Sequence, residues 1–201
     1  MMKKIVVALM LLQAFVGFSQ EKFEIKKIGF SMDFPKDWFS FSDKEMMDNL
    51  DKYDFDEKQM DNFIKSHQES VNFATFTKFD PKKVSGIIPT IKILMRSNPT
   101  KNSTEFLEYV NRMNEGAKAQ LDQFAVAQKP VLVKIAGNDA VKTGYTFTLN
   151  IKKEYIKIRC GTFYIPRGSY FLTLNFIEAI DKEDNSAIFE SLFDSIKLTN
   201  L

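Results

Sequence analysis

The chain has 201 residues, of which 44% are hydrophobic, and it carries 28 basic and 26 acidic side chains. This composition, with 20 Phe, provides a substantial core and excludes a wholly disordered chain. Lys3 and Lys4 are the charged residues of the first twenty, so 26 basic and 26 acidic residues follow them. The chain after residue 20 is therefore about neutral. It lacks the positive field that drives non-specific nucleic-acid binding, and we expect no nucleic-acid partner.

Residues 1–20 have the three parts of a secretory signal peptide. Lys3 and Lys4 form the positive start, Ile5 to Gly17 is apolar, and small or polar residues end at Gln20. The pattern predicts cleavage after Gln20 and a periplasmic or secreted protein, with residues 21–201 as one domain. The alternative is a cytoplasmic protein with an apolar amino-terminal helix. No cysteine lies near the cut, which argues against a lipid anchor, and no later segment has the length of a transmembrane span.

Cys160 is the single cysteine, so no disulfide can form within the chain. In an extended segment it alternates onto the same face as Ile156 and Ile158, opposite Lys157 and Arg159. This placement predicts a buried, inert thiol. Intermolecular pairing or redox chemistry is the alternative.

Residues 22–41 are typical of extended structure interrupted by Pro35. The charged region 42–70 contains apolar residues at helical spacing and predicts helices near 43–51 and 56–68. Strands are expected over 71–80 and 89–99, where proline residues bound the apolar runs.

The clearest helix is predicted over 102–124, with Asn102 or Ser103 as its N-cap and Glu105 in its first turn. Its apolar residues recur at steps of three and four, which favours a core-facing stripe over a partner-binding groove. The stripe consists of Phe106, Val110, Met113, Ala117, Leu121 and Phe124.

Residues 131–179 predict three or four strands joined by tight turns at Gly137 and Gly168. The alternation in 144–151 is typical of an antiparallel sheet with one covered face. A last helix is expected from Asp181 to Ile196, burying its apolar residues. These elements together predict an α+β fold, an antiparallel sheet with helices packed on it.

The order of these elements resembles the PsbP/DcrB-like superfamily. The segments that carry the resemblance are "FSMDFPKDW", "KIAGNDAVKTGYTF", "SYFLTLNF" and "FESLFDSIKL". The matching residues are Phe34, Pro35, Trp38 and Gly137, then Phe193, Ser195 and Ile196 in the last helix. The resemblance implies an α/β/α sandwich that serves as a binding or assembly scaffold. It also implies that 42–70 is a helical insertion or an elaborated connection.

Known catalytic and metal-binding patterns are mostly excluded. His67, the single histidine, lies in a polar stretch and is expected at the surface, without the carboxylate and nucleophile of a triad. One His and one Cys are too few for a zinc site. Asp54 and Asp56 have the spacing of calcium ligands, but Lys58 occupies the next ligand position. We therefore expect no catalytic, cofactor or metal residue, although a hydrolase that uses scattered carboxylates stays open as an alternative.

Trp38, the single tryptophan, is expected to close the rim of the core, with ligand contact as the alternative. Phe34, Pro35, Gly137, Gly168 and Phe193 are likewise candidates for structural roles. The sequence predicts an exported, non-catalytic module that binds an envelope protein. The alternative is a carrier of a small apolar ligand, such as a lipid or acyl chain, in a pocket between sheet and helices.

Overall fold

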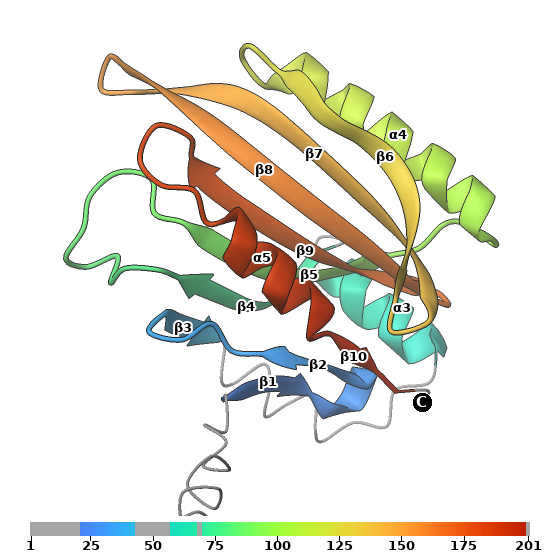
Figure 1. The fold of residues 1–201 in the computed structure, drawn as a ribbon. Coiled ribbons are helices and arrows are strands. Elements are labelled where there is room, and N and C mark those ends of the chain that lie inside the picture. Colours follow the sequence, from blue (N-terminus) through green and yellow to red (C-terminus); the bar gives the residue numbers. More distant parts are fainter. Residues whose placement is uncertain (1–20, 43–56, 68–69, 200–201) are drawn as a thin grey trace, which may run out of the picture.

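The computed structural model describes residues 21–42, 57–67 and 70–199, and seven of their strands form one antiparallel sheet (Figure 1). The leader 1–20, the helix expected near 43–51, and Asp54 and Asp56 lie outside the described residues. Across the sheet the strands are β3 (Phe39–Ser42), β4 (Ser70–Thr77), β5 (Thr90–Ser97), β9 (Tyr170–Ala179), β8 (Glu154–Arg167), β7 (Asn138–Ile151) and β6 (Ala125–Ile135).

The strands β6 to β9 form a meander in which each strand pairs with the next one along the chain. Gly137 and Gly168 adopt positive φ in the first and third of its turns. The second turn, between β7 and β8, consists of Lys152 and Lys153, which also have positive φ. Two consecutive residues with positive φ are the mark of a type I′ hairpin, whose twist matches that of the flanking strands.

A second, three-stranded antiparallel sheet joins the two ends of the described chain. It contains β1 (Lys22–Ile25), β2 (Phe30–Asp33) and β10 (Lys197–Leu198). The short 3-10 helix η1 (Lys26–Ile28) separates β1 from β2 and ends at Gly29, which has a φ of 60°. A Cβ atom at Gly29 would lie 2.5 Å from the carbonyl oxygen of Thr199, so the close approach of the C-terminal segment requires glycine there.

The helices α4 (Ser103–Gln120) and α5 (Ser186–Asp194) lie on opposite faces of the seven-stranded sheet (Figure 1). Tyr164 of β8 packs in the α4 cluster, whereas its neighbour Phe163 stacks on Phe193 of α5 with ring centroids 4.0 Å apart. Adjacent strand residues point to opposite faces, so the two helices are on different sides. The expected α+β class, an antiparallel sheet with helices packed on it, is confirmed.

The main core fills the space between the sheet, α5 and the small sheet. Phe76 is fully buried there, and its ring meets the edges of Phe23 and Phe34 at centroid distances of 5.2 and 5.3 Å. The helix α3 (Glu57–Ser66) adds Met60 and Ile64 to the same cluster, and it confirms the helix predicted over 56–68. The apolar side chains on this side of the sheet therefore pack against one another.

Two predicted helix boundaries are wrong. The helix α4 ends at Gln120, and the chain then turns into β6, which begins at Ala125 rather than near Val131. The helix α5 begins at Ser186, not at Asp181, because Arg159 contacts Asp184 and the Glu178 carboxylate accepts hydrogen bonds from Asn185. Among the helices of the described ranges, none has the length and apolar character needed to cross a membrane.

Candidate functional site

The aromatic residues predicted near the first strand lie at the α5 side of the sheet. Phe34 is half-buried and Pro35 is buried, whereas Trp38 is 8% exposed and meets the edge of Phe189 at a centroid distance of 6.4 Å. Trp38 and Pro35 also border a shallow depression of about 330 Å³ beside α5. This group consists mainly of core side chains.

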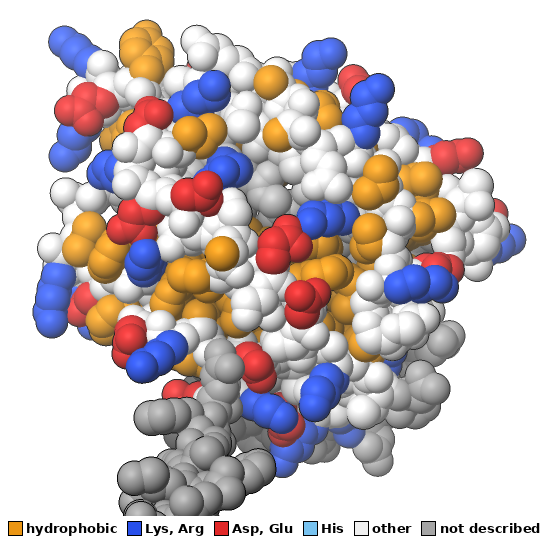
Figure 2. Space-filling model, in the orientation of Figure 1, with side chains coloured by type: hydrophobic (Ala, Val, Ile, Leu, Met, Phe, Trp, Pro, Cys, Tyr) orange, Lys and Arg blue, Asp and Glu red, His pale blue; other side chains and the backbone are white. Residues whose placement is uncertain are grey.

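The remaining structural candidates are spread over the fold. Gly137 occupies the β6–β7 turn and Gly168 the β8–β9 turn, whereas Phe193 lies on α5 against Phe163. The structure therefore does not bring the six predicted residues together at one site. On the molecular face drawn in Figure 2, hydrophobic side chains form several groups interspersed with charged ones.

His67 and Cys160 are the two residues considered for nucleophilic catalysis, and neither has the surroundings that this role requires. His67 is exposed, and its Nδ1 lies 2.8 Å from the carbonyl oxygen of Phe63. Cys160 is buried as predicted, and burial raises the pKa of its thiol. Within the described residues, no three His, Cys, Asp or Glu side chains cluster as a metal site would require.

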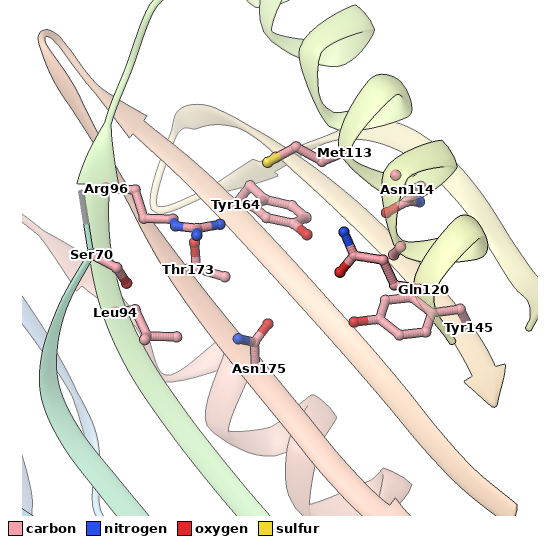
Figure 3. A pocket seen from close by; sticks show the side chains of 12 residues that line it. Ser70, Leu94, Arg96, Met113, Asn114, Gln120, Tyr145, Tyr164, Thr173 and Asn175 are labelled. Atoms are coloured by element: carbon pink, nitrogen blue, oxygen red, sulfur yellow. The ribbon is translucent and has the colours of Figure 1, made fainter. Parts of the chain in front are cut away.

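A groove of about 440 Å³ lies between the C-terminal half of α4 and the exposed part of the sheet (Figure 3). We call it the α4 groove. The amphipathic stripe of α4 explains its position, because Phe106 and Val110 are buried against the sheet whereas Met113 and Ala117 border the groove. The groove is lined by Ser70, Leu94, Arg96, Met113, Asn114, Gly116, Ala117, Gln120, Tyr145, Tyr164, Thr173 and Asn175.

The floor of the α4 groove is built by strand register. Leu94 of β5 pairs with Thr173 of β9, which pairs in turn with Tyr164 of β8. Two residues further along β9, Asn175 pairs with Thr162. Because side chains two residues apart share a face, these residues from three strands lie on one surface beneath α4.

Hydrogen bonds fix part of this polar surface. The Asn114 side-chain amide donates to Thr143 Oγ1 (2.9 Å), and Thr143 donates to the carbonyl oxygen of Gln128 (2.9 Å). Thr162 Oγ1 donates to Asn175 Oδ1 (3.0 Å). These bonds orient the Asn114 and Asn175 amides and link α4 to the sheet.

Two groups of the α4 groove have no partner among the residues that the structure describes. The Thr173 hydroxyl is buried, with the residue 4% exposed, and has no hydrogen-bond partner. Arg96 is exposed at the groove margin and forms no ion pair with any described residue, and no acidic side chain is among those lining the groove. Figure 3 shows the Arg96 guanidinium beside Thr173, with the Tyr164, Tyr145 and Asn175 polar atoms around the same space.

The two groove tyrosines remain protonated well above neutral pH. Burial, the largest cause, raises the pKa of Tyr164 from 10.0 to about 12, with Cys160 adding to the shift and Arg96 opposing it. Burial likewise raises the pKa of Tyr145, with Cys160 as the second cause. Both phenols are therefore hydrogen-bond donors under ordinary conditions and are poor proton-transfer groups near neutral pH.

The Tyr164 shift predicts a loss of stability in alkali. The unfolded chain releases this proton near pH 10, and the folded protein holds it up to about pH 12. The contribution is therefore complete below pH 10 and is lost as the pH rises to about 12. The Tyr164→Phe variant lacks this titrating group. Between these two pH values its unfolding free energy should therefore fall by about 2 kcal/mol less than that of the wild type. Urea unfolding of the wild type and of Tyr164→Phe near pH 10 and near pH 12 measures this difference. Equal changes in the unfolding free energy of the two proteins would contradict the assignment.

Sequence reasoning gave a pocket between sheet and helices only as part of the alternative carrier hypothesis, and it identified none of the polar residues of the groove. The signal was present in β9, where Thr173 and Asn175 alternate with Leu172, Leu174 and Phe176 in a central strand. Polar residues on one face of a central strand indicate either solvent or a site on that face.

Structural comparison relates this chain to known folds. The structure is similar to the solution structure of cyanobacterial PsbP (CyanoP) from Synechocystis sp. PCC 6803, with a TM-score of 0.53 and 10% identity over 92% of this chain and 96% of that chain. It is also similar to LpqN of Mycobacterium tuberculosis, involved in cell envelope biogenesis, with a TM-score of 0.49 and 12% identity over 92% and 88% of the two chains.

A protein from Bacteroides thetaiotaomicron VPI-5482 also has a TM-score of 0.49, with 15% identity over 91% of this chain and 50% of that one. No family model matches the sequence, and no curated protein matches it. At 10% identity the likeness to the cyanobacterial protein shows a shared fold and nothing of function, and the two lower scores carry no argument.

Proposed function

Because the chain has a PsbP/DcrB-like fold, we propose that it is an exported, non-catalytic binding module of the cell envelope that binds its ligand in the α4 groove. Export is supported by the three-part leader at residues 1–20. Binding rather than catalysis is supported by the chemistry of the groove. Its tyrosines stay protonated near neutral pH, and its other polar side chains are hydroxyls, amides and one guanidinium.

The observation that carries this proposal is the unpartnered hydroxyl of Thr173 on the groove floor. Leaving a buried polar group without a hydrogen bond costs about 1–3 kcal/mol. A bound ligand that hydrogen-bonds to Thr173 would recover part of that cost. An unsatisfied buried group in a native protein calls for an explanation, and an ion or ligand that is bound in the functional state is one.

A carrier of an apolar ligand is the weaker alternative. The α4 groove lies in the layer where such a pocket was expected, and Leu94, Met113 and Ala117 give it apolar surface. A lipid chain buried there would also cover Thr173 without giving its hydroxyl a partner, at an energetic cost. The groove is better suited to a ligand that combines polar and apolar parts.

A groove-blocking substitution tests the proposal. A Cβ atom added at Gly116 meets no atom within 4 Å, so a side chain can leave the helix there, and Gly116→Trp adds a large ring at a position that lines the groove. Asn111→Trp, at an exposed position on another face of α4, is the matched control. We expect a thermal-shift panel of organic acids, amines, sugars and fatty acids to contain a class that stabilises the wild type and Asn111→Trp but not Gly116→Trp.

Thermal shifts that are equal in all three proteins would place binding elsewhere. A panel that stabilises none of them would contradict the binding function. Circular dichroism of Gly116→Trp verifies that the variant keeps the fold, so that a lost shift reports on the groove.

A further inference from the structure

The charge of the α4 groove, taken with its proposed binding role, limits the chemistry of the ligand. Arg96 supplies a positive charge to the groove, since a guanidinium is a cation with several hydrogen-bond donors and no acceptor. No lining residue is acidic, and Arg96 forms no ion pair with any residue of the described ranges. A guanidinium that has no ion pair within these ranges and borders a donor-rich groove is suited to an anion.

Neutral donors surround the same space. The phenols of Tyr145 and Tyr164 are protonated, and the Thr173 hydroxyl is unpartnered. Asn175 uses its Oδ1 atom to accept from Thr162, which leaves its Nδ2 group available as a donor. Figure 3 shows the Tyr164 hydroxyl directed toward Gln120 and the Tyr145 hydroxyl toward the side on which Asn175 lies, with Arg96 and Thr173 at the other end of the groove. The arrangement presents several hydrogen-bond donors beside a single cation.

We propose that the α4 groove binds a carboxylate group of an organic ligand, with Arg96 and Thr173 contacting the carboxylate oxygens. A planar monoanion matches a single guanidinium, which can bind both oxygens with two parallel hydrogen bonds. The rings of Tyr145 and Tyr164, together with Leu94 and Met113, then cover the apolar part of the ligand.

The orientation of α4 favours a monoanion over a phosphate dianion. The residues of α4 that line the groove begin at Met113, and the helix ends at Gln120, so its C-terminal half faces the ligand. A helix C-terminus carries a partial negative charge, whereas phosphate sites commonly use a helix N-terminus. The groove has one cation to offset both the ligand charge and this dipole.

The test compares 3-phenylpropionate with its neutral analogue 3-phenylpropanamide and with inorganic phosphate in ¹H–¹⁵N NMR titrations of the full mature chain. We expect the acid to shift the Asn114, Gln120 and Asn175 side-chain amide signals and to bind at least about tenfold more tightly than the amide. Phosphate should bind more weakly than the acid. An acid that gives no shift up to about 10 mM, or binds no better than the amide, would overturn the proposal.

Three variants assign the contacts. Arg96→Gln should weaken acid binding about tenfold, and Thr173→Val about three- to tenfold, whereas Arg112→Gln on the exposed surface of α4 should leave it unchanged. Thr173→Val is nearly isosteric and removes an unpartnered buried hydroxyl, so the free variant should melt no lower than the wild type. If Thr173 had only a structural role, Thr173→Val would not weaken binding while leaving the stability of the free protein unchanged.

The carboxylate assignment and the groove function fail in different ways. If Arg96→Gln binds the acid like the wild type while Gly116→Trp abolishes binding of another compound class, the carboxylate assignment is wrong and the groove function stands. Tighter binding of phosphate than of the acid would also reject the planar monoanion. If no compound of any class is sensitive to Gly116→Trp, both proposals fall.

Discussion

Replacing Trp38 with alanine should lower the free energy of unfolding by about 3–5 kcal/mol, as truncation of a large buried aromatic side chain does. The residue is 8% exposed and belongs to the main core cluster, where its ring meets the edge of Phe189. Its backbone N–H donates to the carbonyl oxygen of Pro35, so the turn after β2 holds the ring in place. Removing the ring leaves a cavity between this turn and α5.

The neighbouring residue Phe39 gives a matched control. It is 42% exposed at the edge strand β3, and Phe39→Ala should cost less than about 1 kcal/mol. Chemical denaturation of the two variants and the wild type measures both effects. If Trp38→Ala unfolds like the wild type, the structural role in the core is wrong. The alternative role, ligand contact at the 330 Å³ depression that the ring borders, would then be favoured.

Periodicity predicted the elements that are amphipathic over their whole length. In β9, Leu172, Leu174 and Phe176 recur every second residue and are buried in the main core. In α4, Phe106 and Val110 recur at helical spacing and are buried against the sheet, and Asn102 caps the helix by accepting from the backbone N–H of Glu105 (3.0 Å). Such signals are local, so one segment of sequence contains the whole pattern.

Features that depend on tertiary contacts were not predictable. The β7–β8 turn uses Lys152 and Lys153 at positive φ, where glycine or asparagine would have marked it. Gly29 is required by the approach of Thr199, a residue at the other end of the described chain. The start of α5 is set by the carboxylate of Glu178, which lies on a different element.

The α4 groove was missed for the same reason. Arg96, Tyr145 and Thr173 come from three strands, and only the register of the sheet brings them to one surface. The stripe of α4 was taken as a continuous core face, but of its residues only Phe106 and Val110 are buried, and Met113 packs against their cluster while also bordering the groove. The helix covers only part of the sheet face, and sequence periodicity contains no information on how far such coverage extends.

A buried carboxylate links the sheet to the start of α5. Glu178 is 1% exposed, and its Oε1 atom accepts from Arg159 Nε (2.9 Å) and Nη2 (2.6 Å). Its Oε2 atom accepts from the backbone N–H (3.0 Å) and the side-chain amide (2.9 Å) of Asn185. The two carboxylate oxygens thus each accept two hydrogen bonds, which is what a buried charge requires. Arg159 also contacts Asp184 (2.8 Å), which extends the cluster to the segment before α5.

Arg159→Met should therefore lower the free energy of unfolding by about 3 kcal/mol, because it leaves the Glu178 charge buried with only the two Asn185 donors. The value is at the low end for a broken buried ion pair, since the Arg159 side chain is 34% exposed.

The control is Lys157→Met, an exposed position two residues earlier on the same strand. It should change the free energy of unfolding by less than about 0.5 kcal/mol. The double variant Arg159→Met with Glu178→Gln should cost less than the sum of the single variants, because the second change removes the charge that the first left uncompensated. Urea unfolding of the four variants measures the coupling. Additive losses would show that the two side chains stabilise the fold independently and that the carboxylate does not need its guanidinium.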